Sequence, residues 1–175
     1  VYTGKVVLGD VAQVDVSGSP ANASINVSWA LIAGKDATES PPATIEVTVV
    51  RDNAGVYSQD RYLYTTGSQG VNETGGTAVT CNPSGGGTDY QCSVSVQINS
   101  GTANAQIVRI KPFWTDTTVK VSGSGFDLKA QTYDIESVSS TETGVTRKVK
   151  VTRTALPQLP AAFDYVLYSE NSITK

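Results

Sequence analysis

The 175-residue chain contains no histidine and no methionine, and it has only two cysteines. Histidine is the commonest general base and the usual partner of a nucleophilic serine, so its absence argues against the triad class of hydrolase. Without histidine or a second cysteine pair, a zinc site is also disfavoured. We therefore expect a protein that is not an enzyme and that binds no cofactor or metal.

Charge and long apolar runs are scarce as well. Charged residues form 17% of the chain, below the roughly 25% that is usual for soluble domains. The net charge is −3, so no basic field across the molecule attracts nucleic acid or anionic lipid. No run approaches the roughly 20 apolar residues that cross a bilayer. Because the sequence starts at Val1 without an initiator methionine, we expect that an upstream segment has been removed.

Apolar and polar residues alternate through much of the chain, which is the pattern of half-buried β-strands. About eight to ten short strands at hairpin spacing, with no convincing helix, predict an all-β fold, either an antiparallel sheet or a sandwich. The length suits one domain, so we expect a single β-rich extracellular domain over residues 1–175. The strand patterns predict a core that includes Ile25, Val27, Trp29, Ile45, Val47, Val49, Ile107, Ile110, Val149 and Val151.

Residues 105–121, AQIVRIKPFWTDTTVKV, form the most apolar stretch, and we expect them to supply a central pair of strands. Pro112 cannot donate to a sheet ladder, so the first strand is expected to end or to meet a sheet edge there. The segment RDNAG, at residues 51–55, predicts a tight turn between two strands, because Asp, Asn and Gly favour turn conformations.

Cys81 and Cys92 enclose the segment NPSGGGTDYQ, whose composition is that of an exposed loop. Their spacing predicts a disulfide, and a disulfide would imply an oxidising, extracellular environment. Two free thiols and half of a metal site are the alternatives.

Basic residues gather in one predicted strand, at Arg147, Lys148, Lys150 and Arg153. Arg109, Lys111, Lys120 and Lys129 could extend them into a stripe if all lay in one sheet. Such a stripe could contact phosphates of nucleic acid or another surface. Alternating lysines are also the ordinary way to solvate one face of a strand and to discourage edge pairing, and we favour that interpretation. DNA is therefore not an expected partner.

Two groups of acidic or amide residues contain the oxygen ligands or carboxylates that a catalytic or metal site would need. A carboxylate pair for hydrolysis could be drawn from Asp127, Asp134 and Glu136. A calcium site could be drawn from Asp52, Asn53 and Asp60, although the order of a known calcium loop is missing. We expect a solvated surface in the first case and a turn in the second.

Two short motifs have weaker support. Ser172 and Lys175 match the spacing of the S-x-x-K motif, but the companion motifs of penicillin-recognising enzymes are missing. Asn22, Asn26 and Asn72 each begin an N-x-S/T sequon, and such sequons arise by chance in a chain rich in serine and threonine.

Three segments carry a family resemblance: AQIVRIKPFWTDTTVKVSGSG, GVTRKVKVTRT and LPQLPAAFDYVLYSENSITK. Together they resemble the C-terminal half of PilX-like type IV pilins of bacteria, in which an "lRIkPly" strand, a valine-rich strand, a "vtRrlqV" strand and an "FdyaLyS…sltK" tail follow one another. The resemblance covers roughly the last seventy residues. The segments YTGKVVLGDVAQVDV and SWALIAGKDATESPPATIEVTVV are similar to the parts that follow the long N-terminal helix in that family.

This resemblance implies a soluble pilin head that lacks a prepilin leader and a hydrophobic N-terminal helix. It implies a structural and adhesive subunit of an extracellular, cell-surface pilus, anchored in the inner membrane through that helix before assembly. The implied partners are other pilin subunits and a receptor on a host or neighbouring cell, and the isolated head would be a monomer. Since the helix packs on the sheet in that family, we expect an apolar patch near residues 105–121.

The sequence departs from the family in one further respect. Pilins commonly close a C-terminal loop with a disulfide, whereas Cys81 and Cys92 lie in the middle of this chain. A receptor-binding surface therefore cannot be transferred from the family. The main alternative is an Ig-like β-sandwich module of an unrelated surface adhesin, and a histidine-free hydrolase with a carboxylate pair is a third hypothesis.

Overall fold

Our computed structural model describes residues 1–32, 39, 41–67, 75–99, 102–140 and 146–154. These residues form eleven β-strands and one turn of 3₁₀ helix, so the predicted all-β class is confirmed. The strand count exceeds the eight to ten expected, because the opening residues and a two-residue segment at position 77 also pair. In the described part of the chain, no helix is long and apolar enough to span a membrane.

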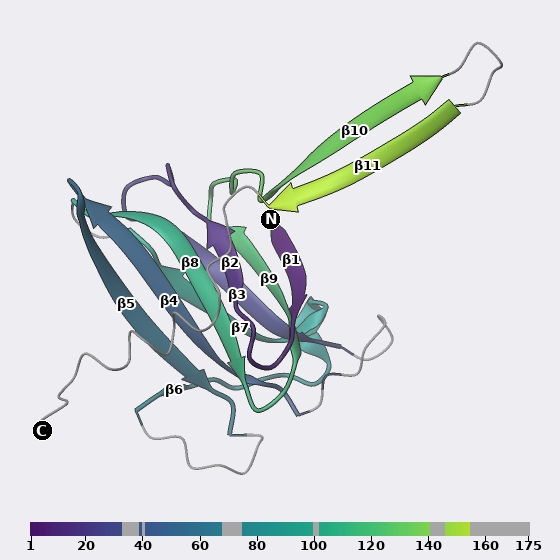
Figure 1. Ribbon diagram of the computed structural model, residues 1–175. Coiled ribbons are helices and arrows are strands. Elements are labelled where there is room, and N and C mark those ends of the chain that lie inside the picture. The colour runs from purple at the N-terminus through teal and green to yellow at the C-terminus, as the bar shows by residue number, and fades with distance from the viewer. Residues whose placement is uncertain (33–38, 40, 68–74, 100–101, 141–145, 155–175) are drawn as a thin grey trace, which may run out of the picture.

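Most of the strands form two sheets that pack as the layers of a sandwich (Figure 1). The first sheet has the order β1-β9-β3-β7, with β1 at Tyr2–Val6, β9 at Thr117–Gly123, β3 at Ser24–Leu31 and β7 at Tyr90–Gln97. All of its neighbours are antiparallel. β3 lies inside the sheet, because it pairs with both β7 and β9.

The second sheet has the order β2-β8-β4-β5-β6, with β2 at Ala12–Asp15, β8 at Asn104–Phe113, β4 at Thr44–Asn53, β5 at Val56–Thr65 and β6 at Thr77–Ala78. Only the short β5–β6 pair is parallel. β2 pairs with β8 no further than Ile110, so Pro112 lies where β8 has β4 as its neighbour and β2 has ended. The prediction of an edge at this proline is therefore confirmed.

The two strands expected from residues 105–121 are central, but they are not a pair. β8 lies between β2 and β4 in the second sheet, whereas β9 lies between β1 and β3 in the first. The short turn that joins them, which includes Trp114 at a φ of 76°, therefore takes the chain from one layer of the sandwich to the other.

Apolar side chains on the inner faces of the two sheets form the core. Seven of the ten predicted core residues are buried: Ile25, Val27, Trp29, Ile45, Val47, Val49 and Ile110. Trp29 is fully buried, and its Nε1 donates to the carbonyl oxygen of Ala43 at 2.8 Å, which satisfies the polar edge of the indole. Ile107 is only half-buried, because β8 turns it to the outer face of its sheet.

The outer face of the second sheet is polar around β4 and β8. Arg109 and Lys111 on β8 pair in register with Thr48 and Glu46 on β4, and all four residues are buried. The apolar patch that we expected on this part of the sheet is therefore not there. In the described part of the chain, the exposed large apolar residues near β8 and β9 lie in loops instead, at Val7, Leu8 and Trp114.

The remaining two strands, β10 at Thr132–Ser140 and β11 at Thr146–Thr154, form a hairpin that we call the arm. Figure 1 shows the arm extending away from the sandwich. The prediction that Val149 and Val151 belong to the core was wrong, since they are 57% and 45% exposed. The physical reason is that, in the described residues, the arm is a separate two-stranded sheet that pairs with neither sheet of the sandwich. The alternating pattern of β11 therefore produces an apolar face that neither sheet covers.

Candidate functional site

The predicted Cys81–Cys92 disulfide is present, with the two Cα atoms 4.4 Å apart. Cys92 is buried in β7, and the bond joins it to the loop that follows β6. The loop between the cysteines includes the 3₁₀ turn η1 at Gly85–Gly87. Gly85 has a φ of 71°, a left-handed conformation that glycine adopts without strain and that other residues rarely adopt.

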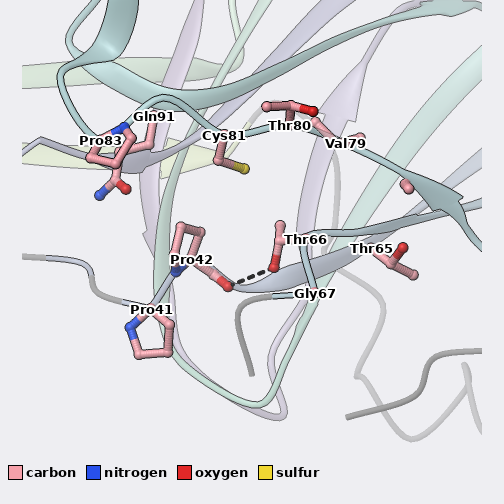
Figure 2. Close-up of a pocket in the computed structure, with 11 residues that line it drawn as sticks. Pro41, Pro42, Thr65, Thr66, Gly67, Val79, Thr80, Cys81, Pro83 and Gln91 are labelled. Carbon is pink, nitrogen blue, oxygen red and sulfur yellow. Dashed lines mark hydrogen bonds between the residues drawn. The ribbon is translucent and has the colours of Figure 1, made fainter. Parts of the chain in front are cut away.

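A hollow of about 600 Å³ lies beside the disulfide (Figure 2). The segments that precede β4, follow β5 and follow β6 line it, mainly with Pro41, Pro42, Thr65, Thr66, Val79, Thr80, Cys81 and Pro83. Thr66 Oγ1 donates to the carbonyl oxygen of Pro42 at 3.1 Å across one side. The residues described around the hollow include no acidic or basic side chain, and they offer apolar, hydroxyl and amide contacts.

The tip of the β4–β5 hairpin is a second exposed feature, which we call the tip and define as residues 52–60. Asp52 Oδ1 accepts a hydrogen bond from Gly55 N at 2.7 Å, which confirms the turn predicted from RDNAG. Asp60 pairs with Arg51. The two aspartates thus serve a turn and an ion pair, and the calcium hypothesis gains no support from them. Val56 and Tyr57 are 70% and 68% exposed.

Arg51 lies beneath the tip and is buried in β4, although the RDNAG segment predicts that it belongs to the turn. Its Nε donates to the carbonyl oxygen of Ile98, and its Nη2 donates to that of Gln97. Burial lowers the pKa of Arg51, but hydrogen bonds to Tyr62 and Asp60 outweigh that effect, so its pKa is raised above the ordinary value. The guanidinium therefore stays charged and joins the second sheet to the end of β7 in the first.

The arm holds the basic residues that the sequence singled out. Arg147, Lys148 and Lys150 are exposed on β11, and Arg153 is in the same strand, although its side chain lies outside the described part. Lys148 pairs with Glu136 of β10, with 2.9 Å between Nζ and Oε2. Part of this basic strand is therefore neutralised within the arm.

The longer basic stripe does not form. Arg109 and Lys111 are buried on β8, Lys120 is on β9 in the other sheet, and Lys129 donates to Ser17 Oγ at 2.9 Å. Because β11 pairs only with β10 in the described residues, these cations lie in three different sheets and a loop. Among the described residues, these cations therefore do not form one continuous basic surface with the arm.

The candidate hydrolytic carboxylates do not converge on a cleft. Glu136 is on the exposed arm, paired with Lys148, whereas Asp127 lies in the loop after β9. The backbone of Asp134 is in β10, but its side chain lies outside the described part. Across the residues that the structure describes, no group of three or more acidic or cysteine side chains is placed to hold a metal ion.

The structure describes two of the three sequons, and the S-x-x-K match lies outside the described residues. Asn22 is exposed in a turn with a φ of 58°, and Asn26 is exposed on β3, so both sequons are at the surface. Asn72, Ser172 and Lys175 lie outside the described residues.

Glu39 is a buried carboxylate that sequence reasoning missed. It accepts hydrogen bonds from Thr117 Oγ1 at 2.8 Å and from the backbone N–H groups of Leu31 and Thr118. It thereby joins the end of β3 to the start of β9. The sequence around Glu39, a polar segment before two prolines, does not indicate burial. Its partners Thr117 and Thr118 are far away in sequence, so no local pattern connects them with Glu39.

Comparison of the chain with protein-family models, with curated proteins and with solved structures finds no match.

Proposed function

We propose that this chain is the head of a structural and adhesive subunit of a bacterial type IV pilus or pilin-like filament, without catalytic activity. The proposal is supported by the exposed apolar and basic side chains that the arm and the tip present to solvent. The arm exposes Ile135, Val149 and Val151 beside the basic residues of β11, and the tip exposes Val56 and Tyr57. The described residues that line the hollow beside the disulfide include no acidic or basic side chain. Such a molecule acts by contact with other surfaces.

The pilin part of the proposal rests on the sequence resemblance, which includes β8, β9 and β11. The disulfide supports an oxidising environment, as outside the cell. Partners of the head would be other subunits of the filament and a receptor on a host or neighbouring cell.

A second candidate, an Ig-like β-sandwich module of an unrelated surface adhesin, is favoured by one specific observation. The inner faces of the two sheets cover each other, and the outer face around β8 has buried Arg109 and Lys111 where a packed helix would need apolar contacts. A helix that anchors this head would therefore have to pack elsewhere on it.

The coding sequence upstream of Val1 separates the two candidates. A pilin has a basic leader followed by about 20 apolar residues with a glutamate near their start, the length of one membrane-spanning helix. A sortase signal or neighbouring sandwich repeats would contradict the pilin proposal and support the adhesin.

Antibody labelling of intact cells tests the shared part of both candidates. We expect label on filaments for the pilin and on the cell wall for the adhesin. A protein found only inside the cell would refute both.

A further inference from the structure

The outer face of the second sheet is buried in its middle, where a two-layer sandwich would leave it in water. On β8, Val108 and Ile110 point into the core, so the alternating Arg109 and Lys111 point to the outer face. These two side chains are nevertheless only 7% and 5% exposed, and Glu46, opposite Lys111 on β4, is buried with them. Long charged side chains on a sheet surface normally extend their heads into water, so this burial indicates a cover.

The described strands do not supply that cover. The inner face of the second sheet packs on the first sheet, which therefore cannot lie on the outer face as well. The arm extends away from the sandwich (Figure 1), and among the described residues its two strands pair only with each other. The cover is therefore a segment beyond the described residues or another molecule.

The chain leaves the described residues at the edge of this same sheet. Thr154, the last of them, pairs with Thr132, which directly follows Gln131. The side chain of Gln131 exchanges two hydrogen bonds with the backbone of Asp15, accepting from its N–H at 2.7 Å and donating to its carbonyl oxygen at 2.9 Å. Asp15 ends β2, the edge strand of the second sheet. The segment 155–175, which we call the tail, therefore begins beside the face in question.

The tail is also long enough to cross the sheet. Fully extended, its 21 residues could span about 70 Å. The three strand spacings from β2 to β5 amount to about 15 Å. The other segments outside the described residues are shorter, the longest being residues 68–74 between β5 and β6. Length and point of attachment both favour the tail.

The outer face combines positive charge with apolar area. Arg61 of β5 and Arg109 of β8 flank the same residue of β4 from its two sides, and Lys111 follows on β8. Glu46 offsets part of this charge, and Leu63, its partner on β5, adds a half-buried apolar side chain to the same face. Such a face fits a segment that supplies both carboxylates and large apolar side chains.

The tail has that composition. Its stretch FDYVLY, at residues 163–168, places Asp164 between the aromatic residues Phe163 and Tyr165, and Glu170 follows two positions after the stretch. Carboxylates pair with guanidinium and ammonium groups, and aromatic rings stack on guanidinium planes. The tail therefore matches the face in charge and in apolar character.

We propose that the tail docks on the outer face of the second sheet of its own molecule, with its carboxylates facing the cations of β5 and β8. The bound tail closes this face to a packed helix or to a second subunit. The inference goes beyond the proposed function, because it holds for a pilin head and for an adhesin module alike.

Lysine acetylation of the full chain, measured by mass spectrometry, tests the proposal. Lys5 is the internal reference, since its side chain is 61% exposed. In the wild type, Lys111 should react at least about ten-fold more slowly than Lys5, because its amine is reached only when the cover opens. Phe163→Ser with Tyr165→Ser should raise the rate at Lys111 by about ten-fold or more and leave Lys5 unchanged, because the tail loses two aromatic contacts.

Val149→Ser with Val151→Ser is the matched control, because it removes two apolar side chains from the exposed arm and should leave the rate at Lys111 unchanged. Circular dichroism shows whether each variant is folded. A folded tail variant in which Lys111 reacts as slowly as in the wild type would overturn the proposal. If the double tail variant unfolds, Asp164→Asn replaces it. This variant keeps the shape of the side chain and should raise the rate at Lys111 by less, and an unchanged rate would again contradict the docking.

Carbodiimide coupling gives an independent readout, because it joins a lysine amine to a carboxylate in contact with it. We expect Lys111 to be linked to Asp164 or Glu170. A mixture of isotope-labelled and unlabelled chains identifies the source of the tail. Links within one isotope support the proposal, whereas links between isotopes would assign the cover to the tail of a second copy and overturn the intramolecular contact. A Lys111 that is linked to neither tail carboxylate would also count against the docking.

Discussion

Arg51 on β4 donates a hydrogen bond from Nε to the carbonyl oxygen of Ile98, 2.6 Å away, in the segment that follows β7 of the other sheet. The same guanidinium donates to the carbonyl oxygen of Gln97 and pairs with Asp60. One buried side chain thus satisfies two backbone acceptors and holds the end of the sandwich closed.

Replacing Arg51 with methionine should destabilise the protein by about 2–3 kcal/mol, because two backbone carbonyl groups lose charge-assisted hydrogen bonds. Urea unfolding at equilibrium measures this loss. Asp60→Asn should cost much less, since the Asp60 side chain is 53% exposed and its ion pair is accessible to solvent. Equal losses in the two variants would show that the ion pair, and not the bonds to the backbone, stabilises this end.

The two tryptophans should report separately on the fold, because Trp29 is fully buried and Trp114 is 52% exposed. Trp114→Phe should leave a blue-shifted emission spectrum and nearly unchanged stability. Trp29→Phe should leave a red-shifted spectrum and cost about 2 kcal/mol, since it removes both buried volume and the hydrogen bond to Ala43. Similar spectra for the two variants would contradict the buried position of Trp29.

The disulfide should stabilise the fold by about 3 kcal/mol in the chain-entropy account, because it closes a short loop in the unfolded chain. Cys81→Ser with Cys92→Ser should lower the midpoint of thermal unfolding, and reductant should lower that of the wild type to a similar value. Alkylation followed by mass measurement checks the bond itself. Two reactive thiols in the native protein would refute it.

Stability should fall in alkaline solution. Burial raises the pKa of Tyr2, Tyr64 and Tyr90 above the ordinary value of 10.0. As pH rises past about 10, the unfolded chain releases these protons first, so it binds fewer protons than the folded chain and becomes favoured. The stabilisation is complete below that pH and is lost as pH rises through the folded pKa values.

Urea midpoints measured between pH 8 and pH 11 check this, a range chosen to bracket the usual tyrosine pKa of about 10. Tyr64→Phe is the matched variant, since Tyr64 is 9% exposed and the ring is retained. Its stability should fall less steeply above pH 10 than that of the wild type. Identical slopes would mean that Tyr64 does not contribute.

Local patterns predicted the strands of the sandwich well. Alternation placed Ile25, Val27 and Trp29 inward on β3 and Ile45, Val47 and Val49 inward on β4, and turn chemistry predicted a hairpin turn within residues 51–55. These features depend on residues close in sequence. The disulfide was predictable for the same reason, since its cysteines are separated by one glycine-rich loop.

Features that depend on distant partners could not be predicted. Val149 and Val151 alternate like core residues, but alternation does not say whether a second layer exists to cover them. The sequence around Arg51 predicts a turn residue, because its acceptors, Gln97 in β7 and Ile98 just after it, are distant in sequence. Glu39 was overlooked since its partners on β9 are brought close only when the sandwich closes.

The position of the disulfide also bears on how the chain survives a protease. Asn82, Pro83, Ser84, Gly86 and Gly87 are exposed, so this loop is a natural place for a cut. Cys81 lies before such a cut and Cys92 after it, so the two fragments would remain covalently joined. Cleavage in this loop would therefore be visible only after reduction, and the nicked protein would keep all of its strands in one piece.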